Sequence, residues 1–363
     1  MTPAADLAAA WRLDLGPGPH DGPGLVAGLV SGGEVRSAIM VGRESFGETY
    51  NRLGPDTVFY VASVSKQFTA ACLALLEASG ALSLTDSIRR HVRGLPQDFE
   101  AVQLSHLLHH TSGVEAPRQL GAVQPNVWWM DVGLDDVIRD MVLRGAVVSV
   151  PGETHVYANE GYWLLAAAVQ GASGESLAAF AEQRIFRPLG MSRTGFRDRP
   201  APLPRPGVAV GHSPHLGQLK PVSTGFHVVG DGGLMTTLQD LARWDLFWSG
   251  RSNLGAELPR RMTRPGVLND GSVLQYAWGV SVRRHRHKPI ISHGGLFIGY
   301  RAKFVRFPEQ DFSVVVLANA ETVEVDGIAL RLADMALEGQ IDPAAPGWNE
   351  TLRPDGRAQD PSV

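Results

Sequence analysis

The sequence is poor in several features that mark large classes of protein. It holds one cysteine, Cys72, which excludes an internal disulfide; its apolar surroundings at helical spacing favour core packing over a reactive thiol. No apolar run approaches the roughly 18 residues of a membrane span, so we expect none. The N-terminus has neither a basic segment nor a long apolar stretch, which predicts no export signal and a cytoplasmic location. The Gly-x-Ser-x-Gly elbow of α/β-hydrolases is also absent.

Charge is scarce too. Only 19% of the residues are charged and the net charge is −4, so nothing indicates nucleic-acid binding. The hydrophobic fraction of 44% predicts a soluble globular protein with a large core. One basic run, Arg283–Lys288, could suggest a metal or polyanion site, but it stands between two strand-like segments. We therefore expect a solvated hairpin tip there.

Strand-like segments stand near both ends of the chain, and helical segments fill the middle. Extended structure is predicted at 24–30, 35–41, 276–283, 289–293, 300–307 and 312–319. Apolar periodicity predicts helices at 63–79, 103–110, 134–144, 160–172, 176–186, 237–248 and 326–338. The simplest arrangement is an α+β fold, an α/β sandwich. In it, an antiparallel sheet built from both chain ends is flanked by helices, and a mostly helical region is inserted.

This arrangement predicts one catalytic domain over residues 1–339. Its α/β part would comprise about 1–80 and 225–339, and its helical insertion about 81–224. Residues 340–363 lack periodicity and should form a loose C-terminal tail.

Ser63 and Lys66 form the pattern that carries most chemistry. A serine three residues before a lysine, at the head of a helix, puts both side chains on one face. The hydroxyl then lies over the positive end of the helix dipole, and the amine can take its proton. With 23 serines and four lysines in the chain, such a pair arises by chance roughly one time in four, so its context matters. The preceding segment, 57–61, is extended, which places Ser63 at a strand-to-helix corner. The alternative is that Ser63 simply caps the helix.

Two further groups of residues could complete a catalytic site. A tyrosine near a lysine, such as Tyr157, can shuttle a proton, and Asn159 can bind a substrate amide or the lysine. Their alternative role is a core tyrosine and a helix cap. His293, Gly294 and Gly295 follow a strand, where glycines let a substrate lie close to the backbone. Their alternative role is a glycine-rich hairpin with a capping histidine.

In order and spacing, these three motifs resemble the serine β-lactamase-like superfamily, on the class C side. That group, which shares the penicillin-binding-protein fold, includes esterases, D-aminopeptidases and D,D-peptidases. The resemblance extends from about residue 24 to 339 and agrees with the α+β arrangement. It includes four further segments, at 107–113, 151–153, 185–191 and 232–237.

The resemblance implies a role for each motif residue. Ser63 would be the acylated nucleophile, Lys66 its general base, and Tyr157 would share in proton transfer to the leaving group. Asn159 would position the substrate. The backbone N–H groups of Ser63 and Leu296 would form the oxyanion hole.

The third motif departs from the pattern. His293, Gly294 and Gly295 would contact the substrate where β-lactamases and penicillin-binding proteins usually have Lys-Thr-Gly. A histidine, with a pKa of about 6.5, is mostly neutral at pH 7, whereas lysine supplies a fixed charge for a substrate carboxylate. We therefore expect weaker selection for such substrates. Histidine at this place resembles the esterase and D-aminopeptidase branches.

Five other residues are candidates for lesser roles. His109 and His110 could be a catalytic pair, but in this context they are expected to hold the loop that ends at Gly113. Trp128–Trp129 and Tyr300 could line an acyl pocket, or pack in the core.

The sequence thus predicts a serine hydrolase that works through an acyl-enzyme on esters or small amides, like a carboxylesterase. It would need no metal and no cofactor, and its partner would be a small-molecule substrate rather than nucleic acid or a membrane. Three alternatives stay open: a biosynthetic transacylase, a D-aminopeptidase or D,D-peptidase, and a non-catalytic binding module. No oligomeric state follows from the sequence.

Overall fold

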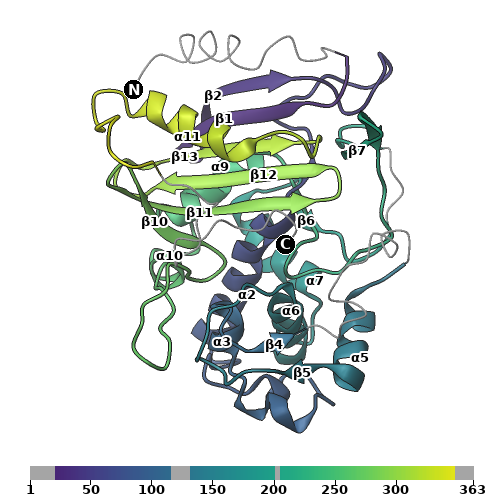
Figure 1. Cartoon of the computed structure of the whole chain (residues 1–363), viewed down its shortest axis with the longest axis vertical. Coiled ribbons are helices and arrows are strands. Elements are labelled where there is room, and N and C mark those ends of the chain that lie inside the picture. Colours follow the sequence, from purple (N-terminus) through teal and green to yellow (C-terminus); the bar gives the residue numbers. More distant parts are fainter. Residues whose placement is uncertain (1–20, 116–130, 201–204, 348–363) are drawn as a thin grey trace.

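The computed structural model describes residues 21–115, 131–200 and 205–347. Its centre is a six-stranded antiparallel sheet in the order β10-β11-β12-β13-β1-β2 (Figure 1). The strands are β1 (Leu25–Ser31), β2 (Glu34–Val41), β10 (Ser281–His285), β11 (Lys288–Phe297), β12 (Tyr300–Phe307) and β13 (Phe312–Ala318). Both ends of the chain therefore build the sheet, and the predicted α+β fold is confirmed.

Helices cover both faces of this sheet and form most of the lower half of Figure 1. The longer ones are α2 (Lys66–Ala78), α5 (Leu134–Arg144), α6 (Asn159–Ser173), α9 (Leu238–Trp248) and α11 (Val325–Ala336). The shorter ones are η1 (Ala62–Ser65), η2 (Ile88–Arg90), η3 (Gln97–Ala101), α3 (Leu104–Leu108), α7 (Leu177–Ala181), η4 (Glu182–Phe186), α8 (Arg187–Leu189) and α10 (Glu257–Met262).

Seven short strands form smaller sheets beside the main one. They are β3 (Phe59–Tyr60), β4 (Val114–Glu115), β5 (Ala146–Val147), β6 (Gly195–Phe196), β7 (His212–His215), β8 (Gln218–Pro221) and β9 (Leu234–Thr236). In one of these sheets β9 lies between β3 and β6, which ties the segment before Ser63 to the middle of the chain.

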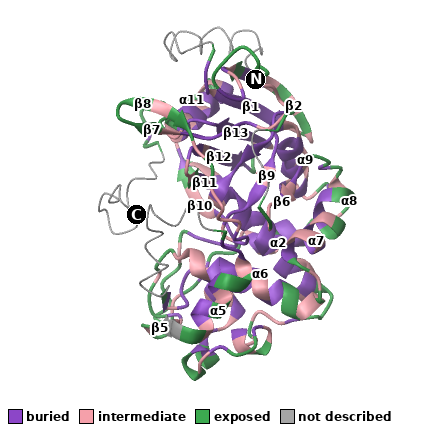
Figure 2. Ribbon diagram, turned by 90° about the vertical axis from the view of Figure 1, so that its right-hand side faces the viewer, coloured by how far each residue is buried: buried purple, intermediate pink, exposed green. Residues whose placement is uncertain are grey.

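The core lies in two layers because the sheet is buried on both faces. All seven residues of β13 are buried, and successive side chains point to opposite faces. Val314 and Val316 pack with the apolar face of α11, whereas Val315 and Leu317 belong to the larger core on the other side. Figure 2 shows this buried band running through β1, β13, α2 and α6. A strand buried on both faces explains the unbroken apolar run in the sequence.

The structure corrects one predicted strand. Extended structure was expected from residue 276, but β10 begins at Ser281. The chain turns at Gly279, whose φ is +71°, and a Cβ there would lie 2.5 Å from the carbonyl carbon of Lys66. The turn packs directly on the first residue of α2, where only glycine fits.

The basic run at 283–288 does form a hairpin turn, but its tip is not simply solvated. His285 is buried and its Nε2 donates to Asp334 of α11 at 2.7 Å. Arg286 pairs with the same carboxylate at 2.8 Å. The expectation of a solvated tip was therefore wrong for these two residues, because α11 presents an acid directly beneath the turn.

The helices of the described residues differ in length and in apolar composition, the two properties on which a membrane span depends. No single helix among them meets both requirements; Asn159–Ser173 and Leu177–Leu189 meet them only as a pair, bent by 73°. Residues 340–347 contain no helix or strand, and the rest of the expected tail lies outside the described residues. The domain boundaries stay a prediction.

Candidate active site

Ser63 lies at a tight corner between β3 and α2. The residue before it, Ala62, has a φ of +46°, a conformation that alanine rarely adopts. The hydroxyl of Ser65 fixes this corner, since it donates to the Ala62 carbonyl at 2.5 Å and accepts from the Leu234 N–H at 3.1 Å. Ser63 itself stays half-buried. The strain is held by neighbouring contacts, and the Ser63 hydroxyl is presented in one place.

Strand β11 presses against the same corner. A Cβ on Gly295 would lie 2.2 Å from the carbonyl oxygen of Val61, so glycine is required for this close approach. The next residue, Leu296, is half exposed. The structure therefore brings the segment 294–296 beside Ser63, as the third motif predicted.

Lys66 is fully buried and its amine has three partners. Its Nζ lies 3.0 Å from Ser63 Oγ, 2.8 Å from Asn159 Oδ1 and 3.0 Å from the Asp231 carbonyl oxygen. A neutral amine has two N–H donors and one lone pair. As an ammonium, Lys66 donates to all three partners; once it has lost a proton, Asn159 and Asp231 can accept its two remaining donors, and its lone pair faces the Ser63 hydroxyl. This geometry lets Lys66 take the proton of Ser63.

Tyr157 lies above this pair. The Lys66 Nζ is 4.9 Å from the centre of its ring, within cation–π range. The residue is 44% exposed. The Tyr157 ring therefore lies near the lysine in a residue that solvent and substrate can reach.

His110 positions Tyr157. The two rings are 4.3 Å apart, and the Ala158 N–H donates to His110 Nδ1 at 3.2 Å. Nδ1 is thus an acceptor, and burial, aided by the Lys66 charge, holds the pKa of His110 well below its usual value. His110 contacts the Tyr157 segment rather than Ser63, which fits a role in holding the loop. His109 likewise bonds to the Ser105 carbonyl of its own helix.

His293 is held as a neutral imidazole. Its Nδ1 donates to the Gly294 carbonyl at 2.6 Å, and its Nε2 is 3.1 Å from the Tyr276 hydroxyl. Burial raises the pKa of Tyr276, so that hydroxyl keeps its proton and donates. Burial and the charge of Lys66 lower the pKa of His293 to about 3. The site therefore has no positive charge at this position at neutral pH.

The neutral state of His293 predicts a pH effect on stability. The unfolded histidine binds a proton below pH 6.5, whereas the folded one does not until about pH 3. Its contribution to stability is therefore complete above pH 6.5 and is lost as the pH falls toward 3. Lowering the pH from 7.5 to 5 should cost the wild type about 2 kcal/mol more than His293→Asn.

Urea unfolding at both pH values measures this difference. His287→Asn is the matched control, because His287 is exposed at the hairpin turn. Equal losses of stability in wild type and His293→Asn would contradict a buried neutral His293.

Several residues of the site were not predicted from the sequence. They are Asp231, Trp163 and Tyr276. The Asp231 carboxylate accepts from Trp163 Nε1 at 2.6 Å, and its burial raises its pKa against the opposing effect of Lys66. Of these three residues, only Asp231 could have been found from the sequence, since it directly precedes the segment 232–237.

The aromatic candidates for an acyl pocket have different outcomes. Trp128–Trp129 lie outside the described residues. Tyr300 is buried and lines a cavity beyond Leu296.

The described part of the chain comprises residues 21–115, 131–200 and 205–347. They contain no group of three or more histidine, cysteine, aspartate or glutamate side chains that could hold a metal ion.

A half-buried serine facing the amine of a buried lysine, at the head of a helix packed on a sheet, is an arrangement that can activate the serine as a nucleophile. The Beta-lactamase family matches residues 15–337 of this chain. The chain belongs to that family, and the resemblance stated from its motifs is confirmed.

Similar proteins include penicillin-binding proteins and D-aminopeptidases. Penicillin-binding protein 4* of Bacillus subtilis (strain 168) is 30% identical over 304 residues, which cover 79% of this chain and 66% of that protein. A D-aminopeptidase of Gluconobacter oxydans (strain 621H) is 26% identical over 314 residues, covering 84% and 57%. The chain thus spans less than two thirds of the length of these curated relatives.

Solved structures share the fold. The octameric penicillin-binding protein homologue from Pyrococcus abyssi has a TM-score of 0.76 at 24% identity, covering 92% of this chain and 77% of that one. A D-stereospecific amidohydrolase from Streptomyces sp. has a TM-score of 0.72 at 21% identity, covering 93% and 99%. At these sequence identities, the structural similarity shows the fold alone and gives no information about the substrate.

Proposed function

We propose that this chain hydrolyses esters or small amides through an acyl-enzyme on Ser63, as a carboxylesterase does. The observation that carries the proposal is the 3.0 Å contact between Lys66 Nζ and Ser63 Oγ, with Asn159 and the Asp231 carbonyl on the same amine. A buried amine whose remaining hydrogens have acceptors can serve as the base for the serine.

The proposed reaction has two halves. Ser63 Oγ attacks the substrate carbonyl as its proton passes to Lys66, and the N–H groups of Ser63 and Leu296 hold the oxyanion. The intermediate collapses, the bond to the leaving group breaks, and Tyr157 hands that group the proton relayed from Lys66. Water then attacks the acyl carbonyl, gives up a proton to the same groups and releases the acid. Ser63 is restored and nothing is oxidised or reduced.

The state of His293 supports esters over peptides with a free C-terminus. A substrate carboxylate on this side of the site would meet a neutral imidazole rather than a fixed cation. Esters and small amides need no such charge. Asn159 would orient their acyl part, and Gly294 and Gly295 would let it lie along β11.

D-Aminopeptidase activity is the second candidate, because several similar proteins carry that name. A panel of p-nitrophenyl acyl esters, D-amino acid p-nitroanilides and a chromogenic cephalosporin separates the candidates. The ester proposal expects the p-nitrophenyl acyl esters to be turned over fastest.

Two further experiments test other parts of the proposal. Adding amine or alcohol acceptors tests for acyl transfer. Cell fractionation tests the cytoplasmic location that we propose from the sequence.

The role of Tyr157 predicts a dependence on the leaving group. A p-nitrophenolate leaves without a proton, whereas an alkoxide needs one. Tyr157→Phe should therefore lower kcat for methyl esters by about 100-fold while changing kcat for p-nitrophenyl esters much less. Steady-state kinetics on a matched acyl group measures both values, with Tyr50→Phe, in the loop after β2, as the control. An equal loss on both esters would argue against Tyr157 as the proton donor.

A further inference from the structure

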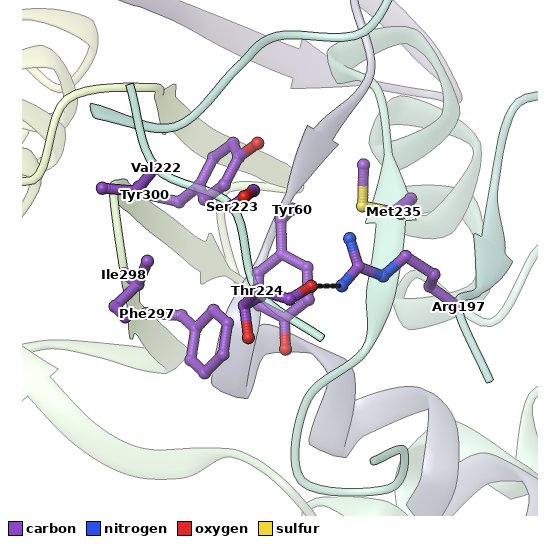
Figure 3. A pocket seen from close by; sticks show the side chains of 9 residues that line it. All are labelled: Tyr60, Arg197, Val222, Ser223, Thr224, Met235, Phe297, Ile298 and Tyr300. Atoms are coloured by element: carbon purple, nitrogen blue, oxygen red, sulfur yellow. Dashed lines mark hydrogen bonds between the residues drawn. The ribbon is translucent and has the colours of Figure 1, made fainter. Parts of the chain in front are cut away.

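A small cavity lies one residue beyond the proposed oxyanion donor Leu296. Its volume is about 20 Å³, room for a water molecule or a single small polar group. Three aromatic rings form its walls, and Figure 3 shows how they surround it: Tyr60, Phe297 and Tyr300. Tyr60 and Phe297 stack with their ring centres 4.9 Å apart. Two of the cavity residues are close in sequence to residues of the active site: Phe297 follows Leu296, and Tyr60 lies three residues before Ser63.

One cation lines this largely apolar cavity. Arg197, just after β6, reaches from the opposite wall toward Thr224 and Tyr60 (Figure 3). Its Nη2 donates to the carbonyl oxygens of Thr224 at 3.1 Å and Phe226 at 3.2 Å. These acceptors are uncharged, and no described carboxylate forms an ion pair with Arg197.

The guanidinium also has an unused donor. Arg197 Nε is buried and has no hydrogen-bond partner among the described residues. Burial raises the pKa of Tyr60 and of Tyr300, and the charge of Arg197 opposes both effects, so that charge acts on the cavity walls. A buried N–H without an acceptor is costly, and a guanidinium pairs best with a carboxylate that accepts from two of its nitrogens.

The course of β11 shows which part of a substrate would reach this cavity. The ring centres of Tyr157 and His293 are 6.1 Å apart, so the proposed proton donor to the leaving group lies at the His293 end of β11. Phe297 is four residues further on, about 13 Å along the strand. With the carbonyl bound at Leu296, the leaving group would point toward His293, and the acyl group, on the other side of that carbonyl, would point toward the cavity.

We propose that this cavity binds the far end of the acyl group and that Arg197 selects acyl groups ending in a carboxylate. The inference rests on the proposed esterase function and names its substrate class: monoesters of short dicarboxylic acids. Leu296 and the cavity wall are one or two residues apart, roughly 3–7 Å, which suits a chain of about three methylenes. The methylenes would lie outside the cavity, along Leu296 and Phe297, and only the terminal carboxylate would enter it and accept from Arg197.

Monomethyl glutarate and methyl pentanoate test this inference, because they have equal carbon chains and differ in the terminal group. We expect the wild type to prefer the glutarate monoester in kcat/KM. Arg197→Gln should lower the ratio of the two kcat/KM values by about 10- to 100-fold, mainly through KM for the glutarate ester. For Arg197→Lys, the ratio of the two kcat/KM values should fall between the ratios of the wild type and Arg197→Gln. Arg199→Gln is the matched control, since this nearby side chain is 87% exposed and should leave the ratio unchanged.

Inhibition provides a second measurement that needs no variant. Glutarate should inhibit hydrolysis of methyl pentanoate competitively in the wild type, and pentanamide should not at the same concentration. If both esters are cleaved with one ratio in wild type and Arg197→Gln, or if glutarate fails to inhibit, this inference is wrong and the esterase proposal stands. If neither ester nor any p-nitrophenyl ester acylates Ser63, the proposed function itself is wrong.

Discussion

Replacing Ser63 with alanine is expected to lower ester turnover by about six decades, to the level of buffer, and to abolish labelling by a fluorophosphonate. The reason is that the Ser63 hydroxyl lies 3.0 Å from the amine of Lys66, which can take its proton. Alanine leaves that amine without a nucleophile to activate. Initial rates on p-nitrophenyl acetate, with intact-mass analysis of the labelled protein, measure both effects.

Ser79→Ala is the control for this experiment. Ser79 follows α2 at its far end, and its hydroxyl donates to the Leu76 carbonyl of that helix. This variant should label and turn over as the wild type does. Undiminished turnover in Ser63→Ala would mean that another residue is the nucleophile.

Replacing Lys66 with alanine has the second largest expected effect, a loss of about three to four decades in kcat/KM. Ser63 would keep its place at the corner after Ala62 but would lose its proton acceptor. Asn159 Oδ1 and the Asp231 carbonyl would also lose their donor, so the folded state should be checked by thermal unfolding. Stopped-flow acylation by p-nitrophenyl acetate measures the loss directly.

Chemical rescue distinguishes a base from a merely structural lysine. The cavity left by Lys66→Ala can admit a small amine such as methylamine, which should restore part of the acylation rate as its concentration rises. Lys220→Ala, at an exposed position in β8, should neither lose activity nor respond to the amine. A fully folded Lys66→Ala variant with wild-type rates would show that Lys66 is not the base.

The sequence predicted those parts of the fold that depend on local pattern. The apolar run of β13 and the apolar periodicity of α6 each indicate which residues of that element are buried. The positions of both elements could therefore be predicted from the sequence alone. The strand expected from residue 276 failed for a non-local reason. Gly279 turns the chain against Lys66, more than 200 residues earlier in the sequence, and no local pattern records that contact.

The same distinction holds for the site. Ser63, Lys66 and Asn159 could be predicted because their side-chain chemistry is visible at a fixed spacing. The third partner of Lys66 is the backbone carbonyl of Asp231, which any residue could supply. The Tyr276 hydroxyl fixes His293 only after the hairpin of β10 and β11 forms, and Arg197 comes to line the same cavity as Phe297 only in the folded chain. Such contacts depend on tertiary structure.

The central claim is that Ser63 carries the acyl group between the two halves of the reaction. Acid quenching of the wild type during turnover of p-nitrophenyl acetate, followed by intact mass and peptide mapping, tests it most directly. We expect one acetyl group per chain, located on Ser63, that decays at the rate of turnover and never forms in Ser63→Ala. Sustained turnover with no acetyl on Ser63, or with the acetyl on another residue, would contradict the claim.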